Sequence, residues 1–548
     1  MMIRGVGQDI LFLLIVSALV RPAGAFMATV FTGGRTWLDP VARPIERALY
    51  RVARIDATLQ MTWAEYATAF VVFGLVGTLV LYAILRTQAP LATPLTPDLA
   101  ANTAISFSTT ATWQAYGGET TMRYATQLVG LTAQNFLAGA AGLAIGIAFI
   151  RGLAGDGTTT VGNFWVDLVR AVLWVLLPLS IVGGIALMVL GVPMNLDPFT
   201  HVTTLDGAAQ TIAQGPVAAL EFIKQLGTNG GGFFNANGAH PFENPAPLSN
   251  FVELLAIATL PASLTYTFGR FTGRPRDGWV LYGVMVALFA GGLATAHWAE
   301  RRGTMEGKEV RFGVNGSVLT AVTTSNGATG STNAADDSFT PLGGAVLLTN
   351  MLLGEIAFGG LGSGLFSILM VAMLGLFVTG LMVGRTPHYL GKPLRAREVR
   401  LIVLYTVVMP LVVLPLTALA VRAPAGLAGL TTNDGPHGLT EIWFAYTSAF
   451  ANNGQAFAGL SANTPFYNVT TAVAMMAGRF GLGVIALALG GTLGAAHRRA
   501  AAGDVPTDSV LFGLIIIGTA VIVGALTYAP PLVLGPIVEH ARLAAGMP

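Results

Sequence analysis

The sequence contains no cysteine among its 548 residues. Disulfide frameworks, thiolate zinc sites and cysteine nucleophiles are therefore excluded. Charged residues are also scarce, at 10% of the chain, whereas soluble domains average about 25%. The 29 Lys and Arg residues nearly balance the 27 Asp and Glu residues, so the chain lacks the net basicity typical of nucleic-acid-binding proteins. We predict no nucleic-acid partner.

Two motifs of ATP-hydrolysing proteins are absent as well. Lys308 and Lys392 each follow a glycine, but the next residues are Glu309 and Pro393, so there is no Walker A sequence. The Asp-Lys-Thr-Gly-Thr motif of phosphorylated P-type ATPases does not occur either. We therefore predict that this chain binds no ATP and has no catalytic site of its own.

Apolar residues dominate what is present. They make up 53% of the chain, and the mean hydropathy is +0.66. Apolar runs of about twenty residues recur along the sequence, which is the length that crosses roughly 30 Å of hydrocarbon. We predict an all-α polytopic membrane protein with ten spanning helices, near residues 8–25, 62–85, 126–150, 166–191, 250–269, 279–298, 364–384, 400–421, 468–495 and 509–528.

The basic residues predict how these spans are oriented. A loop after the first span carries Arg35, Arg43, Arg47, Arg51 and Arg54. Because short loops rich in Lys and Arg remain inside, this loop is expected to be cytoplasmic, and with ten spans both termini are then outside. Alternatively, the first span is a signal peptide cleaved at the small residues 23–25. Cleavage would place the arginine loop outside, so we favour a retained first helix.

Four of the outer connections resemble one another. Each is rich in Gly, Asn, Thr and Ser, at residues 106–114, 226–235, 322–333 and 447–455. A segment compatible with a short helix precedes or leads into each, at about residues 98–108, 215–226, 315–322 and 440–450. The unit of span, short re-entrant helix, polar stretch and span is therefore predicted to occur four times, at a spacing of roughly 100 residues.

Such a unit has a specific physical use. Non-helical backbone at membrane depth is tolerated only where it is buried in protein or lines a watery cavity. Four copies around one axis would direct backbone carbonyls toward a common centre, as in a potassium selectivity filter. Each stretch taken alone also fits an ordinary outer turn, because Asn-Gly and Gly-Gly are turn sequences. Their recurrence behind four short helices favours the filter.

At these stretches the sequence resembles the A subunits of the Kdp potassium-transporting ATPases (the KdpA family), which belong to the Trk/Ktr/HKT-like superfamily of potassium transporters. The resemblance covers essentially the full length and is most specific at residues 226–237, 240–245, 354–364, 384–391 and 448–459. It implies a potassium-selective, channel-like subunit with four pore repeats and one extra helix at each end.

The resemblance also implies a division of the chain. Residues 1–61 would form the N-terminal span and a basic cytoplasmic loop. The four pore repeats would occupy residues 62–150, 151–271, 272–399 and 400–499, and the C-terminal span residues 500–548.

The filter positions implied by the resemblance would bind K⁺ as the transported ion. By repeat they are Thr110, Thr112 and Gln114; Gly230, Gly231 and Gly232; Ala328, Thr329 and Gly330; and Asn452, Asn453 and Gly454. The first repeat departs from a more Asn-rich family pattern. The third segment is one residue longer than is usual in the family, so its register is left open.

Two intramembrane charges attract attention because such charges are costly and commonly functional. Glu355 lies in a glycine-rich apolar stretch, where Gly359 and Gly360 should interrupt the helix. The resemblance implies that Glu355 lies at the entrance of a route from the pore to the catalytic subunit; the alternatives are pairing with a buried Arg or capping a broken helix. Arg479 would block leakage below the filter, or else form a salt bridge or reach the interface.

The implied partners follow from the resemblance too. They are a P-type ATPase catalytic subunit, a periplasmic-facing accessory subunit and a small single-span subunit, together with lipid of a bacterial inner membrane. A stand-alone potassium channel or cation symporter is the alternative function. We expect Glu221 and Lys224, beside the second re-entrant helix, to form a surface pair without a role in function.

Overall fold

The computed structural model describes residues 2–89, 94–384, 386–499 and 505–546. The predicted boundary at residue 500 lies outside these ranges. Within them the chain is predominantly helical, and ten helices are long and apolar enough to cross a membrane. The predicted all-α polytopic fold is therefore confirmed.

The ten spans run through one helix or through several that continue directly into one another. They are α1 (Met2–Phe31), α3 (Trp63–Thr87), η1 and α6 (Thr126–Thr132, Ala133–Ala154), α7, η2 and α8 (Phe164–Arg170, Ala171–Leu176, Leu177–Val189), α10 (Pro247–Thr272), α11 (Pro275–Ala299), α14 (Ser363–Val383), α15 (Ala396–Ala420), α18, η6 and α19 (Pro465–Met476, Ala477–Gly481, Leu482–Ala495), and α20, η7 and α21 (Val510–Leu532, Val533–Ile537, Val538–Ala544).

The predicted end of the last span, at residue 528, is wrong. The helix continues to Ala544 through Pro530 and Pro531, and a π-helical turn at η7 contains Pro536. Local π-helical adjustment lets a spanning helix accommodate prolines that lack an N–H donor, because the freed backbone groups find other partners.

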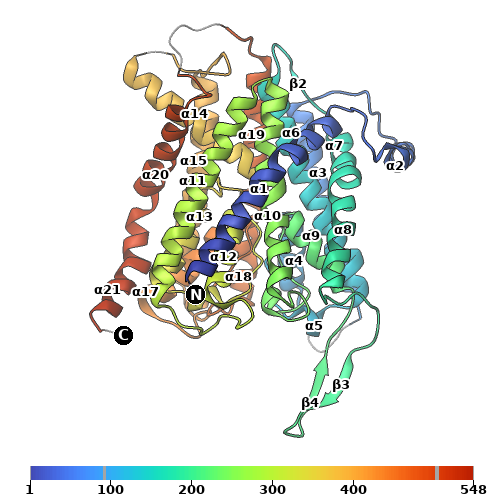
Figure 1. Ribbon diagram of the computed structural model, residues 1–548, viewed down its shortest axis with the longest axis vertical. Coiled ribbons are helices and arrows are strands. Elements are labelled where there is room, and N and C mark those ends of the chain that lie inside the picture. The colour runs from blue at the N-terminus through green and yellow to red at the C-terminus, as the bar shows by residue number, and fades with distance from the viewer. Residues whose placement is uncertain (1, 90–93, 385, 500–504, 547–548) are drawn as a thin grey trace.

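Four shorter helices precede the polar stretches: α4 (Pro97–Ser108), α9 (Val217–Leu226), α12 (Gly313–Asn326) and α17 (Gly435–Ala451). Local sequence explains where α4 begins. The Thr96 side chain caps the helix by accepting a hydrogen bond from the Leu99 N–H, and Pro97 occupies the first turn. All four lie in the half of the molecule from which the hairpin of β3 (Thr200–Thr203) and β4 (Ala209–Ile212) projects (Figure 1).

The loop predicted after the first span contains a helix, α2 (Asp39–Ala53), at the opposite end of the molecule from the hairpin (Figure 1). The remaining helices are short: α5 (Gly118–Thr121), α13 (Pro341–Leu352), α16 (Pro424–Leu427) and the 3₁₀ turns η3 (Asn237–Ala239), η4 (Glu300–Arg302) and η5 (Asp336–Ser338). Two small strand pairs join β1 (Met61–Thr62) to β2 (Thr160–Gly162) and β5 (His388–Tyr389) to β6 (Lys392–Pro393).

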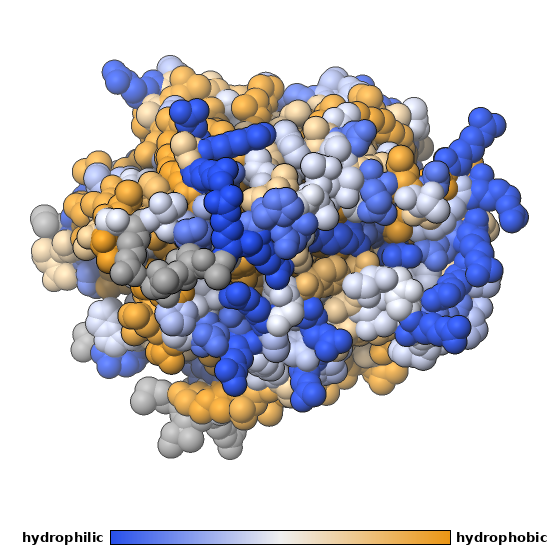
Figure 2. Space-filling model, turned by 90° about the horizontal axis from the view of Figure 1, so that it is seen from above, coloured by the Kyte–Doolittle hydropathy of each residue, from blue (hydrophilic) through white to orange (hydrophobic). Residues whose placement is uncertain are grey.

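The start of α1 and the end of α21 lie in the half of the molecule that carries the β3–β4 hairpin (Figure 1). At the α2 end, a buried contact joins three helices: Arg151 on α6 pairs with Asp167 on α7 at 2.5 Å and 2.8 Å, and the Tyr66 hydroxyl on α3 donates to the same carboxylate. Figure 2 looks onto this end and shows hydrophilic side chains spread across it.

Candidate functional site

The stretches that follow the four short helices share one backbone pattern. In each, a residue with positive φ is followed two positions later by another: Thr110 and Thr112 (67° and 42°), Thr228 and Gly230 (48° and 75°), Ala328 and Gly330 (49° and 76°), and Asn452 and Gly454 (57° and 88°). L-residues seldom adopt positive φ, so its recurrence in register is a structural signature. The equivalent triplets are residues 110–112, 228–230, 328–330 and 452–454.

Each triplet is tied back to its own helix. The middle residue of three triplets donates its N–H to the carbonyl five residues earlier, as Asn229 to Lys224 (2.9 Å), Thr329 to Thr324 (3.3 Å) and Asn453 to Ser448 (3.0 Å). In the first repeat Thr112 donates to Ser106 at 3.1 Å. These bonds satisfy N–H groups that would otherwise be orphaned at a buried turn, and they fix the triplets to the helix ends.

The four triplets contact one another in a closed ring. The middle carbonyl oxygen of one triplet faces the third residue of a neighbouring triplet in every case: Asn229 faces Thr112, Thr329 faces Gly230, Asn453 faces Gly330, and Ala111 faces Gly454. The ring therefore runs through repeats 1, 2, 3 and 4 in order and returns to repeat 1.

Glycine at three of the four third positions has a steric cause. A Cβ atom added at Gly230, Gly330 or Gly454 would overlap the facing carbonyl oxygen, and each glycine has positive φ. The first repeat has Thr112 instead, and its hydroxyl donates a hydrogen bond to the facing Asn229 carbonyl.

The predicted residues of the second repeat begin two positions later than the structural equivalents. Gly230 is in its triplet, but the first two members, Thr228 and Asn229, were missed, as was Ala111 in the first repeat. Counting from the ends of the first three short helices would have found them, because Thr228 follows the last residue of α9 by two positions, as Thr110 follows α4 and Ala328 follows α12. The predicted register of the third repeat agrees with the common pattern.

Gly231, Gly232 and Gln114 lie just beyond the ring. The Gln114 side chain accepts a hydrogen bond from the Gly232 N–H (2.7 Å), and its amide nitrogen donates to the Gly232 carbonyl (3.2 Å) and the Tyr116 hydroxyl (2.8 Å). A Cβ atom at Gly231 would lie 2.8 Å from the Gln114 side-chain oxygen. Gln114 therefore joins the first and second repeats at one mouth of the ring.

Two cavities meet the ring from opposite sides. One, of about 740 Å³, is lined by third-position residues Thr112, Gly330 and Gly454 together with Gln114 and Gly231. The other, of about 120 Å³, is lined by the four first-position residues Thr110, Thr228, Ala328 and Asn452. The triplets thus separate the two cavities, and the larger is called the outer cavity and the smaller the inner cavity below.

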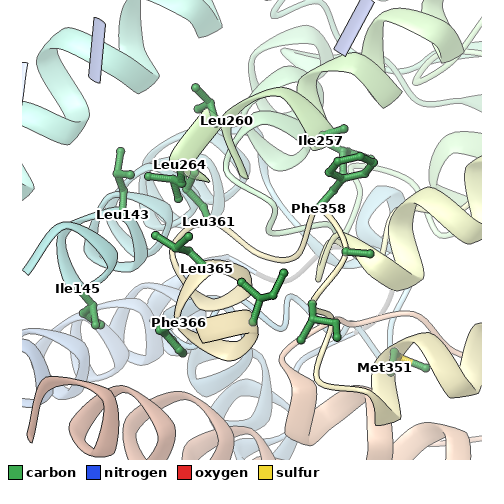
Figure 3. Packing of buried hydrophobic residues seen from close by; sticks show 14 of the residues in the cluster. Leu143, Ile145, Ile257, Leu260, Leu264, Met351, Phe358, Leu361, Leu365 and Phe366 are labelled. Atoms are coloured by element: carbon green, nitrogen blue, oxygen red, sulfur yellow. The ribbon is translucent and has the colours of Figure 1, made fainter. Parts of the chain in front are cut away.

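A non-helical segment, residues 353–362, closes the inner side. It separates α13 from α14, so the interruption predicted from Gly359 and Gly360 is confirmed. The Leu361 N–H donates to the Thr228 hydroxyl at 2.8 Å, and a Cβ atom at Gly360 would lie 2.8 Å from Cβ of Ala328. Figure 3 shows Phe358 and Leu361 of this segment beside core residues of α6 and α10.

Glu355 in this segment is buried and lines the inner cavity. Its carboxylate accepts a hydrogen bond from the side chain of Asn453, at 2.8 Å. No arginine among the described residues pairs with Glu355. The alternative prediction, that Glu355 pairs with a buried arginine, is therefore wrong within the described residues. The carboxylate is thereby held directly against the fourth triplet.

Arg479 lies in the π-helical turn η6 and also lines the inner cavity. Its guanidinium donates to the Ala138 carbonyl of α6 at 2.8 Å and lies 5.9 Å from the Phe70 ring centroid. No carboxylate of the described ranges forms an ion pair with Arg479. Within these ranges the alternative prediction of a salt bridge is therefore wrong. The inner cavity therefore contains one cation and one carboxyl group that are not paired with each other.

Glu221 and Lys224 form the expected pair, but the expected surface position is wrong. Both side chains are buried, and Lys224 contacts the carboxylates of Glu221 (2.6 Å) and Glu243 as well as the Asn237 side chain (2.9 Å). The Asn237 amide donates to the Gly231 carbonyl at 2.7 Å. The network therefore supports the second stretch from behind. Sequence reasoning missed it because Glu243 lies in a separate loop, nineteen positions after Lys224.

Comparisons with known proteins agree with this architecture. The family model described as "Potassium-transporting ATPase A subunit" matches residues 10–541. A protein of Methylobacterium nodulans named "Potassium-transporting ATPase potassium-binding subunit" is 51% identical, over 100% of this chain and 99% of its own. One of the same name from Solibacter usitatus is 48% identical, over 98% of each.

A solved structure, that of the potassium transporter TrkH from Vibrio parahaemolyticus, has a similar fold. The TM-score is 0.53 and the match covers 88% of this chain and 97% of that one, at 13% identity. At this identity the likeness concerns the fold alone. It supports a helical fold with several membrane-spanning helices.

Proposed function

This chain belongs to the potassium-transporting ATPase A subunit family, and on that premise we propose that its ring of four triplets is a K⁺ selectivity filter. The chain would bind K⁺ from outside and pass it to a P-type ATPase catalytic subunit. The observation that carries this proposal is the closed ring of triplets between two cavities. Carbonyl oxygens around such an axis can replace the hydration shell of K⁺.

The proposed filter comprises the predicted residues Thr110, Thr112, Gly230, Ala328, Thr329, Gly330, Asn452, Asn453 and Gly454, to which we add Ala111, Thr228 and Asn229. Gln114, Gly231 and Gly232 would form its outer mouth. We retain the division into an N-terminal span, four pore repeats and a C-terminal span, with the boundaries given above. The hairpin end and both termini would face outside, in a bacterial inner membrane.

The inner cavity suggests how an ion could leave the filter. Beyond Glu355 and Arg479 it extends past Tyr405 of α15 to Thr527 and Tyr528 of α20. In this proposal Glu355 attracts the ion into the route, Gly359 and Gly360 give the segment its close fit, and Arg479 opposes straight leakage by repulsion. An accessory periplasmic-facing subunit, a small single-span subunit and surrounding lipid complete the proposed assembly.

Potassium binding tests the filter directly. We expect the purified chain to bind K⁺ in isothermal titration and to bind Na⁺ at least about tenfold more weakly, a difference of about 1.4 kcal/mol. The control is the same titration with choline chloride at equal ionic strength. Equal affinities for K⁺ and Na⁺ would contradict the proposal.

Substitution of Gln114 by arginine should weaken K⁺ binding by at least about tenfold, because a cation would stand at the outer mouth and repel K⁺. The new side chain would also lose the acceptor for the Gly232 N–H. The measurement is K⁺ affinity in the purified chain. The control is Gln210→Arg on the exposed hairpin, which adds the same charge elsewhere. If Gln114→Arg keeps the wild-type K⁺ affinity and selectivity, the Gln114 side chain does not lie on the ion path.

Replacing Glu355 by glutamine should separate binding from transport. The amide oxygen can still accept from Asn453, so K⁺ affinity at the filter should change by less than a few-fold, whereas transport should fall by about tenfold or more because the attracting charge is gone. Transport is measured as ⁸⁶Rb⁺ uptake by the reconstituted complex. Glu306→Gln in an exposed loop is the matched control. Unchanged uptake would exclude a role for the Glu355 charge.

A further inference from the structure

A cluster outside the filter brings three distant segments together at the hairpin end. His437 and Glu441 lie one turn apart on α17, Asp337 is in η5, and Glu539 is on α21. The His437 Nε2 atom lies 2.7 Å from Asp337 Oδ1 and 3.6 Å from Glu441 Oε1. One ligand atom from each of these three residues falls within 4.8 Å of the other two.

We propose that Asp337, His437 and Glu441 form a site for a divalent transition-metal ion, with Zn²⁺ as the ion that fits best. One imidazole nitrogen and two carboxylate oxygens are ligands that Zn²⁺ accepts, and a water would complete a four-coordinate shell. His437 and Glu441 are four residues apart, which places both on one face of α17. The three side chains are partly or fully buried, so the ligands are preorganised.

Two further observations point to a metal ligand rather than to a simple acidic patch. The other ring nitrogen of His437, Nδ1, lies 2.7 Å from Glu539 Oε1. Metal-binding histidines commonly have their second nitrogen fixed by a carboxylate in this way. In addition, Glu441 is 1% exposed, and in the described structure its Oε2 atom has no hydrogen-bond partner. A buried carboxylate oxygen without a partner is costly unless it has a cation to bind.

A bound ion would join parts of the chain that are about a hundred residues apart in sequence. α17 leads directly into the fourth triplet, while Asp337 belongs to the loop after the third. Because an ion that binds only the folded state stabilises it, Zn²⁺ should hold the outer ends of these two repeats and α21 together.

The test is titration of ZnCl₂ into the full chain, purified through a tag without histidine and freed of metal with a chelator. We expect about one Zn²⁺ per chain by calorimetry and a rise in the unfolding temperature. His437→Gln and Glu441→Gln should each weaken binding at least about tenfold, and Glu539→Gln by about 10- to 100-fold. His201→Gln, on the exposed hairpin, should leave the affinity unchanged.

Two results would overturn the site: absence of Zn²⁺ binding to the wild-type chain, and binding that survives His437→Gln. If His437→Gln fails to fold, Glu441→Gln and Glu539→Gln test the site in its place, and unchanged Zn²⁺ affinity in both would overturn it. Mg²⁺ serves as the control ion, because it prefers oxygen ligands and should bind this nitrogen-containing set poorly.

A second, independent observation concerns α2. Val41, Ile45, Leu49 and Val52 recur at helical spacing along one side of it, with exposed fractions between 42% and 84%. Arg43, Arg47 and Arg51 recur along the other side, and Arg54 follows at the end of the helix. Between the two stripes Ala42 and Glu46 are buried, and Glu46 pairs with Arg170 of α7 at 3.1 Å.

We infer that α2 lies in the interface of a bilayer that carries anionic lipid, with the apolar stripe in the acyl region and the arginines at the headgroups. The helix follows the span α1 after a short connection and is tied to the first turns of another span by the pair of Glu46 with Arg170, which places it at the level where hydrocarbon ends. A helix with opposed apolar and basic faces is typical of interfacial anchors. The arginine stripe matches an anionic lipid surface rather than a neutral one.

The absence of cysteine makes the test direct. Single variants Leu49→Cys and Arg47→Cys, each labelled with an environment-sensitive dye, are reconstituted in vesicles of phosphatidylcholine with and without phosphatidylglycerol. We expect lipid-attached quenchers to reach the dye at position 49 but not at 47, and more strongly with phosphatidylglycerol. Equal quenching by aqueous iodide at both positions would overturn the inference. Protection at position 49 only after an ATPase partner is added would instead assign this face to that partner.

Discussion

The variant Gly230→Ala is expected to lose high-affinity K⁺ binding, with an affinity reduced by at least about 100-fold, or about 2.7 kcal/mol. The Cβ atom would overlap the Thr329 carbonyl oxygen, and the φ of 75° is unfavourable for alanine. The triplet must shift, and the carbonyl that we assign to the ion must move with it. The measurement is K⁺ titration of the purified variant.

A matched control separates the effect of the steric overlap in the ring from the effect of an alanine at positive φ. Gly207, in the turn of the β3–β4 hairpin, has a φ of 80°, but nothing lies within 4 Å of an added Cβ atom. Gly207→Ala should therefore carry the same backbone strain and leave K⁺ affinity unchanged. If Gly230→Ala binds K⁺ as the wild type does, the ring is not the binding site.

The variant Lys224→Met is expected to lose about 3–5 kcal/mol of folding stability. Removal of the ammonium group would leave the carboxylates of Glu221 and Glu243 buried without a counter-charge. The loss should appear as a lower unfolding temperature of the purified chain. K⁺ affinity should fall too, because Lys224 positions Asn237, which holds the Gly231 carbonyl.

An exposed ion pair provides the comparison. Arg276 and Asp508 lie 3.8 Å apart with side chains 85% and 44% exposed, so Arg276→Gln should cost less than about 1 kcal/mol. Neutralising the network in the triple variant Lys224→Met, Glu221→Gln, Glu243→Gln should restore part of the stability. Equal, small effects of Lys224→Met and Arg276→Gln would show that the buried charges contribute nothing specific.

The spans and the short helices could be predicted from sequence because their signals are local. Hydropathy runs identify the spans, and a capping Thr96 with Pro97 defines the start of α4 within one residue of the predicted position. The glycines of the interrupted segment likewise signal a break directly. The last span was misjudged because Pro530 and Pro531 suggest an end, and the π-helical turn that accommodates them has no clear sequence pattern.

The arrangement around the ring could not be predicted in the same way. Lys224 looks like a surface residue until Glu243, nineteen positions later, is found beside it. The cluster of Asp337, His437 and Glu539 joins segments separated by about a hundred residues each. The pairing of each carbonyl with its facing glycine depends on how the four repeats are arranged around the ring. The sequence pattern within one repeat contains no information on that arrangement.

The most direct test of the central claim is ATP hydrolysis by the membrane complex that co-purifies with a tagged copy of this chain, measured with K⁺ and with Na⁺. We predict that a P-type ATPase subunit co-purifies, that K⁺ stimulates hydrolysis, that Na⁺ does not, and that Gly230→Ala abolishes the stimulation while Gly207→Ala preserves it. A complex without ATPase activity, together with K⁺ uptake by the chain alone in liposomes, would contradict the account and assign the chain to stand-alone channels or symporters.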